Sequence, residues 1–113
     1  MKKQYNQLPQ VAFSILLALS LKERHGYEII KQIADDSNGK ITLSPGALYT
    51  SIKQLLEQKL ISEVDQKDDP RRRYYKLSAK GKSVLGGELE YYQNTIALAR
   101  QRQVLEISYG VYC

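Results

Sequence analysis

The chain reads Leu43-Ser44-Pro45-Gly46-Ala47-Leu48-Tyr49 immediately before an amphipathic run. Ser44 is placed to cap the N-terminus of a helix, and Pro45 then takes the first helical position, where its missing N–H costs nothing and its ring presets φ. Gly46 leaves the first turn without a side chain, so the helix start can approach another molecule closely. We therefore predict a helix over residues 45–58, with an exposed N-terminus suited to entering a DNA groove.

This helix is expected to bury one side and expose the other. Its apolar residues follow the spacing i, i+4, i+7 and i+8, which forms one buried stripe; they are Leu48, Ile52, Leu55 and Leu56. The opposite side carries Gly46, Thr50, Lys53, Gln54 and Glu57, with Tyr49 at the border. Thr50 and Gln54 suit base edges, Lys53 suits phosphate or guanine, and the Tyr49 hydroxyl suits a phosphate. The alternatives are a solvated face and, for Tyr49, an aromatic ring at the core edge.

Two strands at residues 60–64 and 73–77 are predicted to follow, joined by a polar tip at 65–72. Arginine in a hairpin suits the phosphate backbone or a narrow minor groove. The alternative is a solvated turn. The candidate DNA contacts here are Lys67, Arg71, Arg72 and Arg73, with Lys76 further along the second strand.

Two helices are expected before this region. The first covers residues 9–22 and is apolar nearly all round, which indicates a helix covered on more than one side. It is too short to span a bilayer, and no signal-peptidase site follows it, so a cytoplasmic protein is expected. The second helix follows Gly26 and ends in the turn formers 35–39. Residues 41–43, in which Ile41 and Leu43 flank a polar residue, predict a very short strand.

Ser78 is placed to cap a last, long helix. Its apolar residues step by four, three, four and three positions, as in a coiled-coil seam; they are Leu85, Leu89, Tyr92, Ile96 and Ala99. Because the small domain is already closed, we expect this helix to lack a partner in its own chain and to pack on a second copy, aided by the first helix. Gly86 and Gly87 either permit close helix approach or mark a kink. The tail at 107–113 is either poorly ordered or docked on the partner.

Composition agrees with a DNA-binding protein. The 113 residues form one domain, and their net charge of +5 favours nucleic acid over a membrane surface as the partner. A single cysteine, Cys113, excludes an internal disulfide framework and fits a reducing cytosol. The only histidine, His25, is expected to make a structural hydrogen bond at a helix start. One histidine assembles neither a metal cluster nor a catalytic triad, so no metal, cofactor or enzymatic activity is expected.

Four motifs together resemble the PadR family of bacterial transcriptional regulators, over roughly residues 10–85. They are His25-Gly26-Tyr27-Glu28-Ile29, the stretch 43–49, Leu60-Ile61 and Arg73-Tyr74-Tyr75-Lys76-Leu77-Ser78-Ala79-Lys80-Gly81. The resemblance implies a winged helix-turn-helix over residues 1–77, a dimerisation helix and tail over 78–113, and usually repression. It maps the family's DNA-contacting serine, glycine and tyrosine to Ser44, Gly46 and Tyr49, and its basic wing to Arg71, Arg72 and Arg73.

Two departures from the family limit what carries over. Thr50 stands where members often have a basic residue, so their base preference does not transfer. Some short members bind flat aromatic drugs between tryptophans, whereas this chain has none.

The sequence therefore predicts a mainly α (α+β) winged helix-turn-helix protein that binds DNA as a homodimer. Two-fold symmetry implies a pseudo-palindromic operator with half-sites about 34–36 Å apart, or a multiple of that distance. A small-molecule effector is a further possible partner. The main rival is a winged-helix module that binds protein without binding DNA, and a small enzyme is a more distant one.

Overall fold

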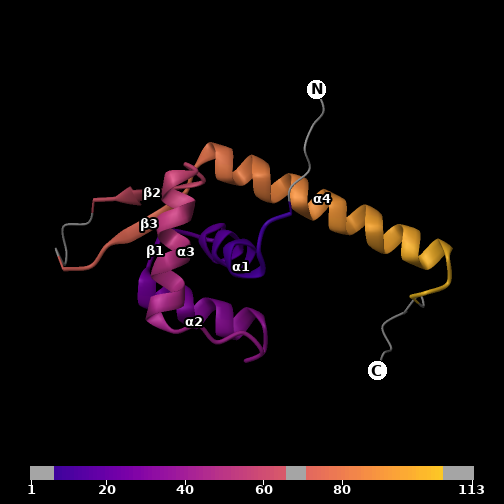
Figure 1. Cartoon of the computed structure of the whole chain (residues 1–113), viewed down its shortest axis with the longest axis horizontal. Coiled ribbons are helices and arrows are strands. Elements are labelled where there is room, and N and C mark those ends of the chain that lie inside the picture. The colour runs from indigo at the N-terminus through magenta and orange to yellow at the C-terminus, as the bar shows by residue number, and fades with distance from the viewer. Residues whose placement is uncertain (1–6, 66–70, 106–113) are drawn as a thin grey trace.

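The computed structural model describes residues 7–65 and 71–105, and it confirms the mainly helical class with a small sheet (Figure 1). Lys67 and the tail at 107–113 lie outside the described residues. The elements in chain order are α1 (Gln10–Leu19), β1 (Arg24–His25), α2 (Gly26–Asp36), α3 (Pro45–Glu57), β2 (Ile61–Val64), β3 (Tyr74–Leu77) and α4 (Ala79–Gln101).

The sheet is antiparallel, with strand order β1-β3-β2. β1 pairs Arg24 with Tyr75 and His25 with Tyr74, so it occupies the edge of β3 that β2 leaves open. The predicted strand at residues 41–43 is wrong, because these residues lie in a loop between α2 and α3. Ile41 and Leu43 pack against the core as half-buried side chains, which accounts for their alternation without a strand.

α1 lies at the centre of the core and contacts α2, α3, α4 and β3. Its Ile15, Leu16 and Ala18 are completely buried, which confirms that the helix is covered on more than one side. α1 ends at Leu19, three residues before the predicted end. Ser20 closes it by donating its hydroxyl hydrogen to the Leu17 carbonyl oxygen at 2.6 Å.

α4 begins against this core and then runs away from the body of the molecule (Figure 1). The prediction that it lacks a partner in its own chain is wrong for its first half, which packs on α1. Leu85, predicted in the dimer seam, is 5% exposed and belongs to this chain's own core. The Tyr92 ring meets Phe13 of α1 edge-on, with ring centroids 5.5 Å apart. The long helix is therefore anchored at one end.

The starts of β2 and α4 are bonded to each other. The Ser78 N–H donates to the Leu60 carbonyl oxygen at 3.0 Å, and the Ser78 hydroxyl donates to the Lys59 carbonyl oxygen at 2.7 Å. Ser78 also caps α4 as predicted, because its hydroxyl oxygen accepts the Gly81 N–H at 2.9 Å. Gly81 faces the Leu60 carbonyl so closely that a Cβ atom there would overlap it. This junction fixes where α4 leaves the sheet.

None of the helices within residues 7–65 and 71–105 is long and apolar enough to cross a membrane. The same residues contain no group of three or more His, Cys, Asp and Glu side chains that could hold a metal ion.

Candidate nucleic-acid interface

The predicted cap of α3 is confirmed. The Ser44 hydroxyl oxygen accepts the Ala47 N–H at 3.1 Å, and Pro45 occupies the first helical turn. α3 ends at Glu57, with Gln58 as its C-terminal cap, which matches the predicted range to one residue. Among the described atoms, nothing lies within 4 Å of a Cβ built on Gly46, so the helix start is bare. A backbone or base edge can therefore reach it without a side chain in between.

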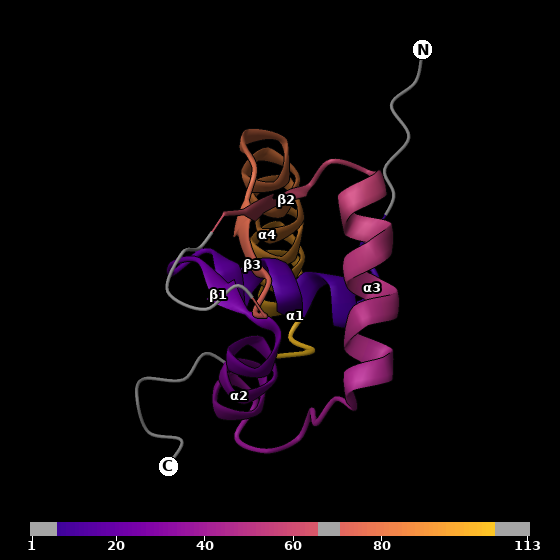
Figure 2. The ribbon, with the colours of Figure 1, turned by 90° about the vertical axis from the view of Figure 1, so that its left-hand side faces the viewer.

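The two sides of α3 are also as predicted. Leu48, Ile52 and Leu55 are buried, and Leu56 is half-buried. The exposed positions are Gly46, Thr50, Lys53, Gln54 and Glu57. Figure 2 shows α3 along one side of the molecule, where none of the other described helices or strands covers its outer face. Gln54 lines a hollow that α3 shares with α4, so it lies on the side of α3 nearer to α4.

Tyr49 is 47% exposed and links α3 to the start of α2. Its hydroxyl and ring lie directly over Gly26, where a Cβ atom would overlap them. Leu48 contributes a second close neighbour, its Cδ2 atom 3.2 Å from that Cβ position. The Tyr49 ring can therefore pack on the start of α2 only because residue 26 has no side chain.

Replacing Gly26 with alanine is expected to displace Tyr49, because its hydroxyl is at the movable end of the side chain. Overpacking of this kind costs about 1–3 kcal/mol of stability, and we expect the lower end of that range. DNA affinity should fall about as much in Gly26→Ala as in Tyr49→Ala, as measured by fluorescence anisotropy. An affinity equal to that of the unmodified chain would show that the position of Tyr49 does not matter for DNA.

The hairpin formed by β2, β3 and their connection is called the wing below. Its three arginines, Arg71, Arg72 and Arg73, are exposed. Arg73 Nη1 lies 3.2 Å from Glu63 Oε2, an ion pair across the two strands. Because such an exposed pair contributes only about 0–1 kcal/mol, exchanging Glu63 for a phosphate costs Arg73 little.

A cavity of about 500 Å³ brings Tyr49 together with the wing arginines. It lies between the wing, α3 and the start of α2, and its lining residues are His25, Gly26, Tyr27, Tyr49, Arg71, Arg72, Arg73 and Tyr75. Sequence reasoning did not place Tyr27 at the site, although it is 68% exposed there. The only signal was its position in the His25-Gly26-Tyr27 motif. Guanidinium groups and tyrosine hydroxyls in one hollow suit an anionic backbone.

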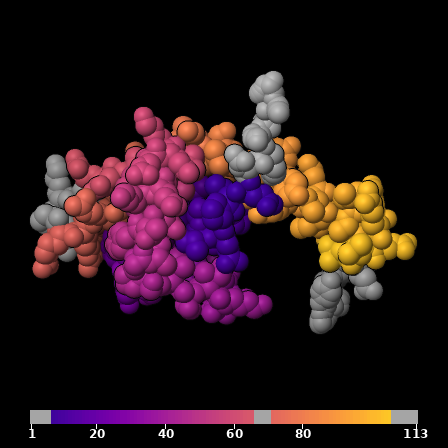
Figure 3. Space-filling view, viewed as in Figure 1, coloured from indigo at the N-terminus to yellow at the C-terminus, as the bar shows by residue number. Residues whose placement is uncertain are grey.

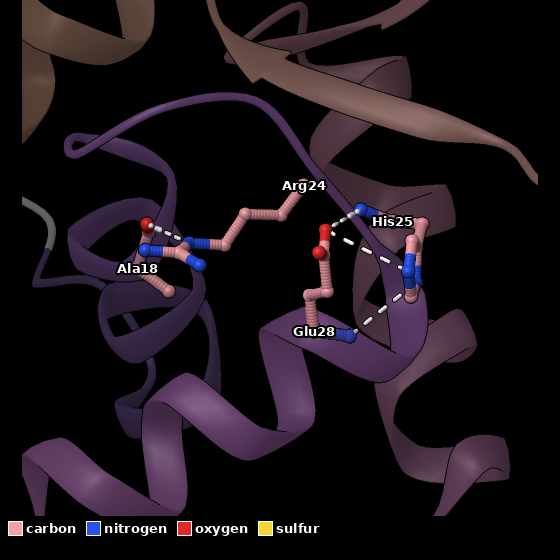
Figure 4. A network of polar contacts seen from close by, with 4 residues as sticks. All are labelled: Ala18, Arg24, His25 and Glu28. Atoms are coloured by element: carbon pink, nitrogen blue, oxygen red, sulfur yellow. Dashed lines mark hydrogen bonds and ion pairs between the residues drawn. The ribbon is translucent and has the colours of Figure 1, made fainter. Parts of the chain in front are cut away.

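His25 joins the wing to α2 (Figure 4). Its Nδ1 accepts the Glu28 N–H at 3.4 Å, and Glu28 Oε1 accepts the His25 N–H at 3.2 Å, which forms a capping box. The His25 ring meets Tyr74 of β3 edge-on, and Arg24 Nε donates to the Ala18 carbonyl oxygen at 3.0 Å. The predicted structural role of His25 is confirmed.

Tyr75 closes the floor of this cavity from β3. Burial raises the pKa of its hydroxyl above the usual value of 10.0, and the neighbouring Tyr49 and Glu63 raise it further, whereas Arg73 lowers it. The hydroxyl therefore stays protonated at neutral pH. A neutral hydroxyl adds no negative charge to the cavity.

The comparisons with known proteins agree with this geometry. The model of the transcriptional regulator PadR-like family matches residues 15–87, which is more than half of the chain. An uncharacterized protein X of Lysinibacillus sphaericus is 37% identical over 76 residues, covering 64% of this chain and 69% of that protein. The transcriptional regulator YqjI of Escherichia coli K12 is 46% identical over 48 residues, but these cover only 42% of this chain and 23% of YqjI.

Among solved structures, a PadR family transcription regulator of Clostridium difficile R20291 superimposes with a TM-score of 0.71 at 23% identity. The match covers 84% of this chain and 99% of that one, so the two share a fold over nearly all of the smaller structure. The family match and the shared fold agree with the four motifs of the sequence. The chain belongs to the PadR-like family of transcriptional regulators.

Proposed function

We propose that the protein is a homodimer that binds double-stranded DNA sequence-specifically and acts as a repressor. The observation that carries the proposal is the joint position of Tyr49 and the wing arginines around one cavity, beside the bare start of α3. A hydroxyl donor from α3 and the positive charge of the wing are then presented to the same ligand. A net charge of +5 supports the same partner.

In this proposal α3 enters the major groove. Ser44 and Gly46 bring the helix start against the backbone, while Thr50, Lys53 and Gln54 meet base edges or phosphate. Tyr49 donates its hydroxyl hydrogen to a phosphate oxygen. The wing contacts the flanking backbone or minor groove through Arg71, Arg72 and Arg73, and also through Lys67.

The second half of α4 supports a dimer. Among the described residues after Tyr92, only Ala99 is even half-buried. Leu89 and Ile96 are 41% and 43% exposed, and Figure 3 shows open space between the body of the molecule and the far end of α4. The part of α4 from residue 93 to residue 101 is exposed apart from Ala99, and a short stretch of unpacked helix is marginal in water. A second copy that packs on it would therefore stabilise it. The proposed seam contains Leu89, Tyr92, Ile96 and Ala99, without Leu85.

The proposed units are residues 1–77 for DNA binding and 78–113 for dimerisation, and together they imply a pseudo-palindromic operator. A dimer seated where an operator overlaps a promoter would exclude RNA polymerase, so repression is the proposed outcome. A DNA partner also places the protein with the chromosome in the cytoplasm. A small molecule that favours wrongly spaced recognition helices would release the DNA.

Selection from a genomic fragment library tests DNA binding. We expect the protein to retain fragments that contain an inverted repeat and to bind them at least about 1,000-fold more tightly than random DNA. The affinity should fall steeply as salt rises, because bound counterions are released. Retention of no fragment above random DNA would contradict the proposal and favour a module that binds protein.

Replacing Ile96 with glutamate is expected to shift the protein from dimer to monomer. A charge in an apolar seam loses hydration without gaining a partner, and it should weaken the dimer at least tenfold in sedimentation equilibrium. Asn94→Glu is the matched control, because Asn94 lies on the opposite side of α4 and gains the same charge. A monomeric unmodified protein at micromolar concentration, or equal effects of the two variants, would contradict this seam.

A further inference from the structure

A second hollow lies between α3 and α4, apart from the wing. Its volume is about 640 Å³, within the usual range for small-molecule sites. Gln54 of α3 and its C-terminal cap Gln58 form one wall, Ser83 and Glu88 of α4 form the other, and Leu8 lines the hollow just before α1. Apolar side chains, among them Leu55, complete the lining. The hollow therefore has a mixed lining, in which apolar side chains alternate with polar ones.

Glu88 is the unusual group in this hollow, because its side chain is buried with only 3% exposed. Its Oε2 atom accepts two hydrogen bonds, from the Leu8 N–H at 3.2 Å and from the Tyr92 hydroxyl at 2.9 Å. Both donors are neutral. Within the described part of the chain, no lysine, arginine or histidine forms an ion pair with Glu88. Buried carboxylates in proteins are almost always paired with a positive charge, and no residue that the structure describes supplies one to Glu88.

The nearest cation lining the hollow does not supply that charge. Lys80 lies two helical turns before Glu88 on α4, and its Nζ donates to the Gln58 carbonyl oxygen at 3.1 Å. Its ammonium group is thus held at the other end of the hollow by the end of α3. Lys80 therefore does not fill the part of the hollow that Glu88 lines.

We propose that this hollow binds a small organic cation, a protonated amine with a compact apolar body, whose ammonium group pairs with Glu88. The carboxylate then gains the charged partner that its burial requires, while the apolar body covers the side chains of α3 and α4. The neutral hydrogen bonds from Leu8 and Tyr92 hold the carboxylate in place. Glu88 selects for charge, and the volume limits the size of the ligand.

The position of the hollow also gives the cation a regulatory effect, a step that rests on the proposed function. α3 would read DNA and α4 would hold the partner chain, so a ligand between them alters the angle of one against the other. A 23-residue helix is about 34 Å long, so a small rotation at its base moves its far end by several ångströms. The spacing of the two recognition helices in a dimer would change accordingly.

Calorimetry on the DNA-free protein tests the site with a series of primary ammonium ions, from ethylammonium to benzylammonium. Each is compared with the neutral alcohol of the same skeleton. We expect at least one amine to bind at least tenfold more tightly than its alcohol. Glu88→Gln keeps the size and the acceptor oxygen but removes the charge, so it should abolish this difference. Glu90→Gln, an exposed neighbour on the same helix, should leave it unchanged.

A blocking variant keeps the test valid if Glu88→Gln folds poorly. Gly87 lines this hollow, and a Cβ atom there meets no described atom within 4 Å, so a side chain at 87 can start into the hollow. Gly86 is equally open but lines a different hollow. We expect Gly87→Leu to lose amine binding and Gly86→Leu to keep it, with both folded by circular dichroism. Equal binding of amines and alcohols throughout the series, or equal effects of the paired variants, would overturn the site.

A DNA titration with and without the best amine separates this inference from the proposed function. Saturating amine should change operator affinity at least threefold in the unmodified protein and not in Glu88→Gln. Unchanged affinity would overturn the regulatory effect. DNA binding without amine binding would overturn the cation site alone, whereas amine binding without DNA binding would contradict the proposed function and leave the site standing.

Discussion

Gly81→Ala is expected to destabilise the protein by about 2–3 kcal/mol, the largest loss that we expect from an alanine substitution at any of the described glycines. The new Cβ atom would overlap the carbonyl oxygen of Leu60, which is backbone and cannot turn aside. The same carbonyl accepts the Ser78 N–H, so a shift of Leu60 also disturbs the start of α4. Both the sheet and the base of the long helix are affected by one methyl group.

Urea unfolding followed by far-ultraviolet circular dichroism measures this effect. Gly86→Ala on the same helix is the matched control, because its Cβ atom would enter open space. Alanine in a helix interior is about 1 kcal/mol more favourable than glycine, so the control should be at least as stable as the unmodified protein. If both variants had the same stability, the close contact of Gly81 with Leu60 would not be a constraint on the fold.

The second large effect is expected on DNA binding, from removing one cation on α3 and one on the wing. Lys53→Ala and Arg72→Ala should each weaken binding about 10- to 100-fold at about 0.1 M salt, because each variant removes two cations from the DNA interface of a dimer. The slope of log affinity against log salt should become shallower by about two in each variant. For Arg72→Ala the loss should be similar for different DNA sequences, since phosphates carry no sequence information.

Lys82→Ala provides the control for charge alone. Lys82 is exposed on α4, outside the cavity that Tyr49 shares with the wing arginines, and its loss changes the net charge by the same amount. We expect its salt slope to equal that of the unmodified protein. A slope that fell equally in all three variants would assign the salt dependence to overall charge rather than to this interface.

Local signals predicted most of the helices, because each depends on residues close in sequence. Ser44 and Ser78 cap helices where expected, and the buried stripe of α3 follows its spacing. β1 was missed because Arg24 and His25 have no strand preference of their own. They pair only because β3 has an open edge beside them. The short strand predicted at 41–43 failed for the same reason, since alternation alone does not provide a partner strand.

The sequence pattern of α4 does not show which surface its apolar residues contact. A seam of apolar residues looks the same whether it packs on the chain's own α1, as Leu85 does, or on a second copy. Glu88 was missed as a buried residue, although its spacing from Leu85 and Tyr92 places it on the same side of the helix. The exposed face of α3 was predicted from periodicity, whereas the contact of Tyr49 with Gly26 depends on how α2 and α3 pack.

Hydroxyl-radical footprinting on a fragment recovered from the genomic library tests whether two copies of α3 enter major grooves on one face of the DNA while the wings cover the flanks. We expect two protected patches related by two-fold symmetry, with centres about 34–36 Å apart or a multiple of that distance. Arg72→Ala should lose protection only at the outer edges. A single unpaired patch, or protection no stronger than on random DNA, would show that the protein does not bind DNA as a symmetric dimer through α3.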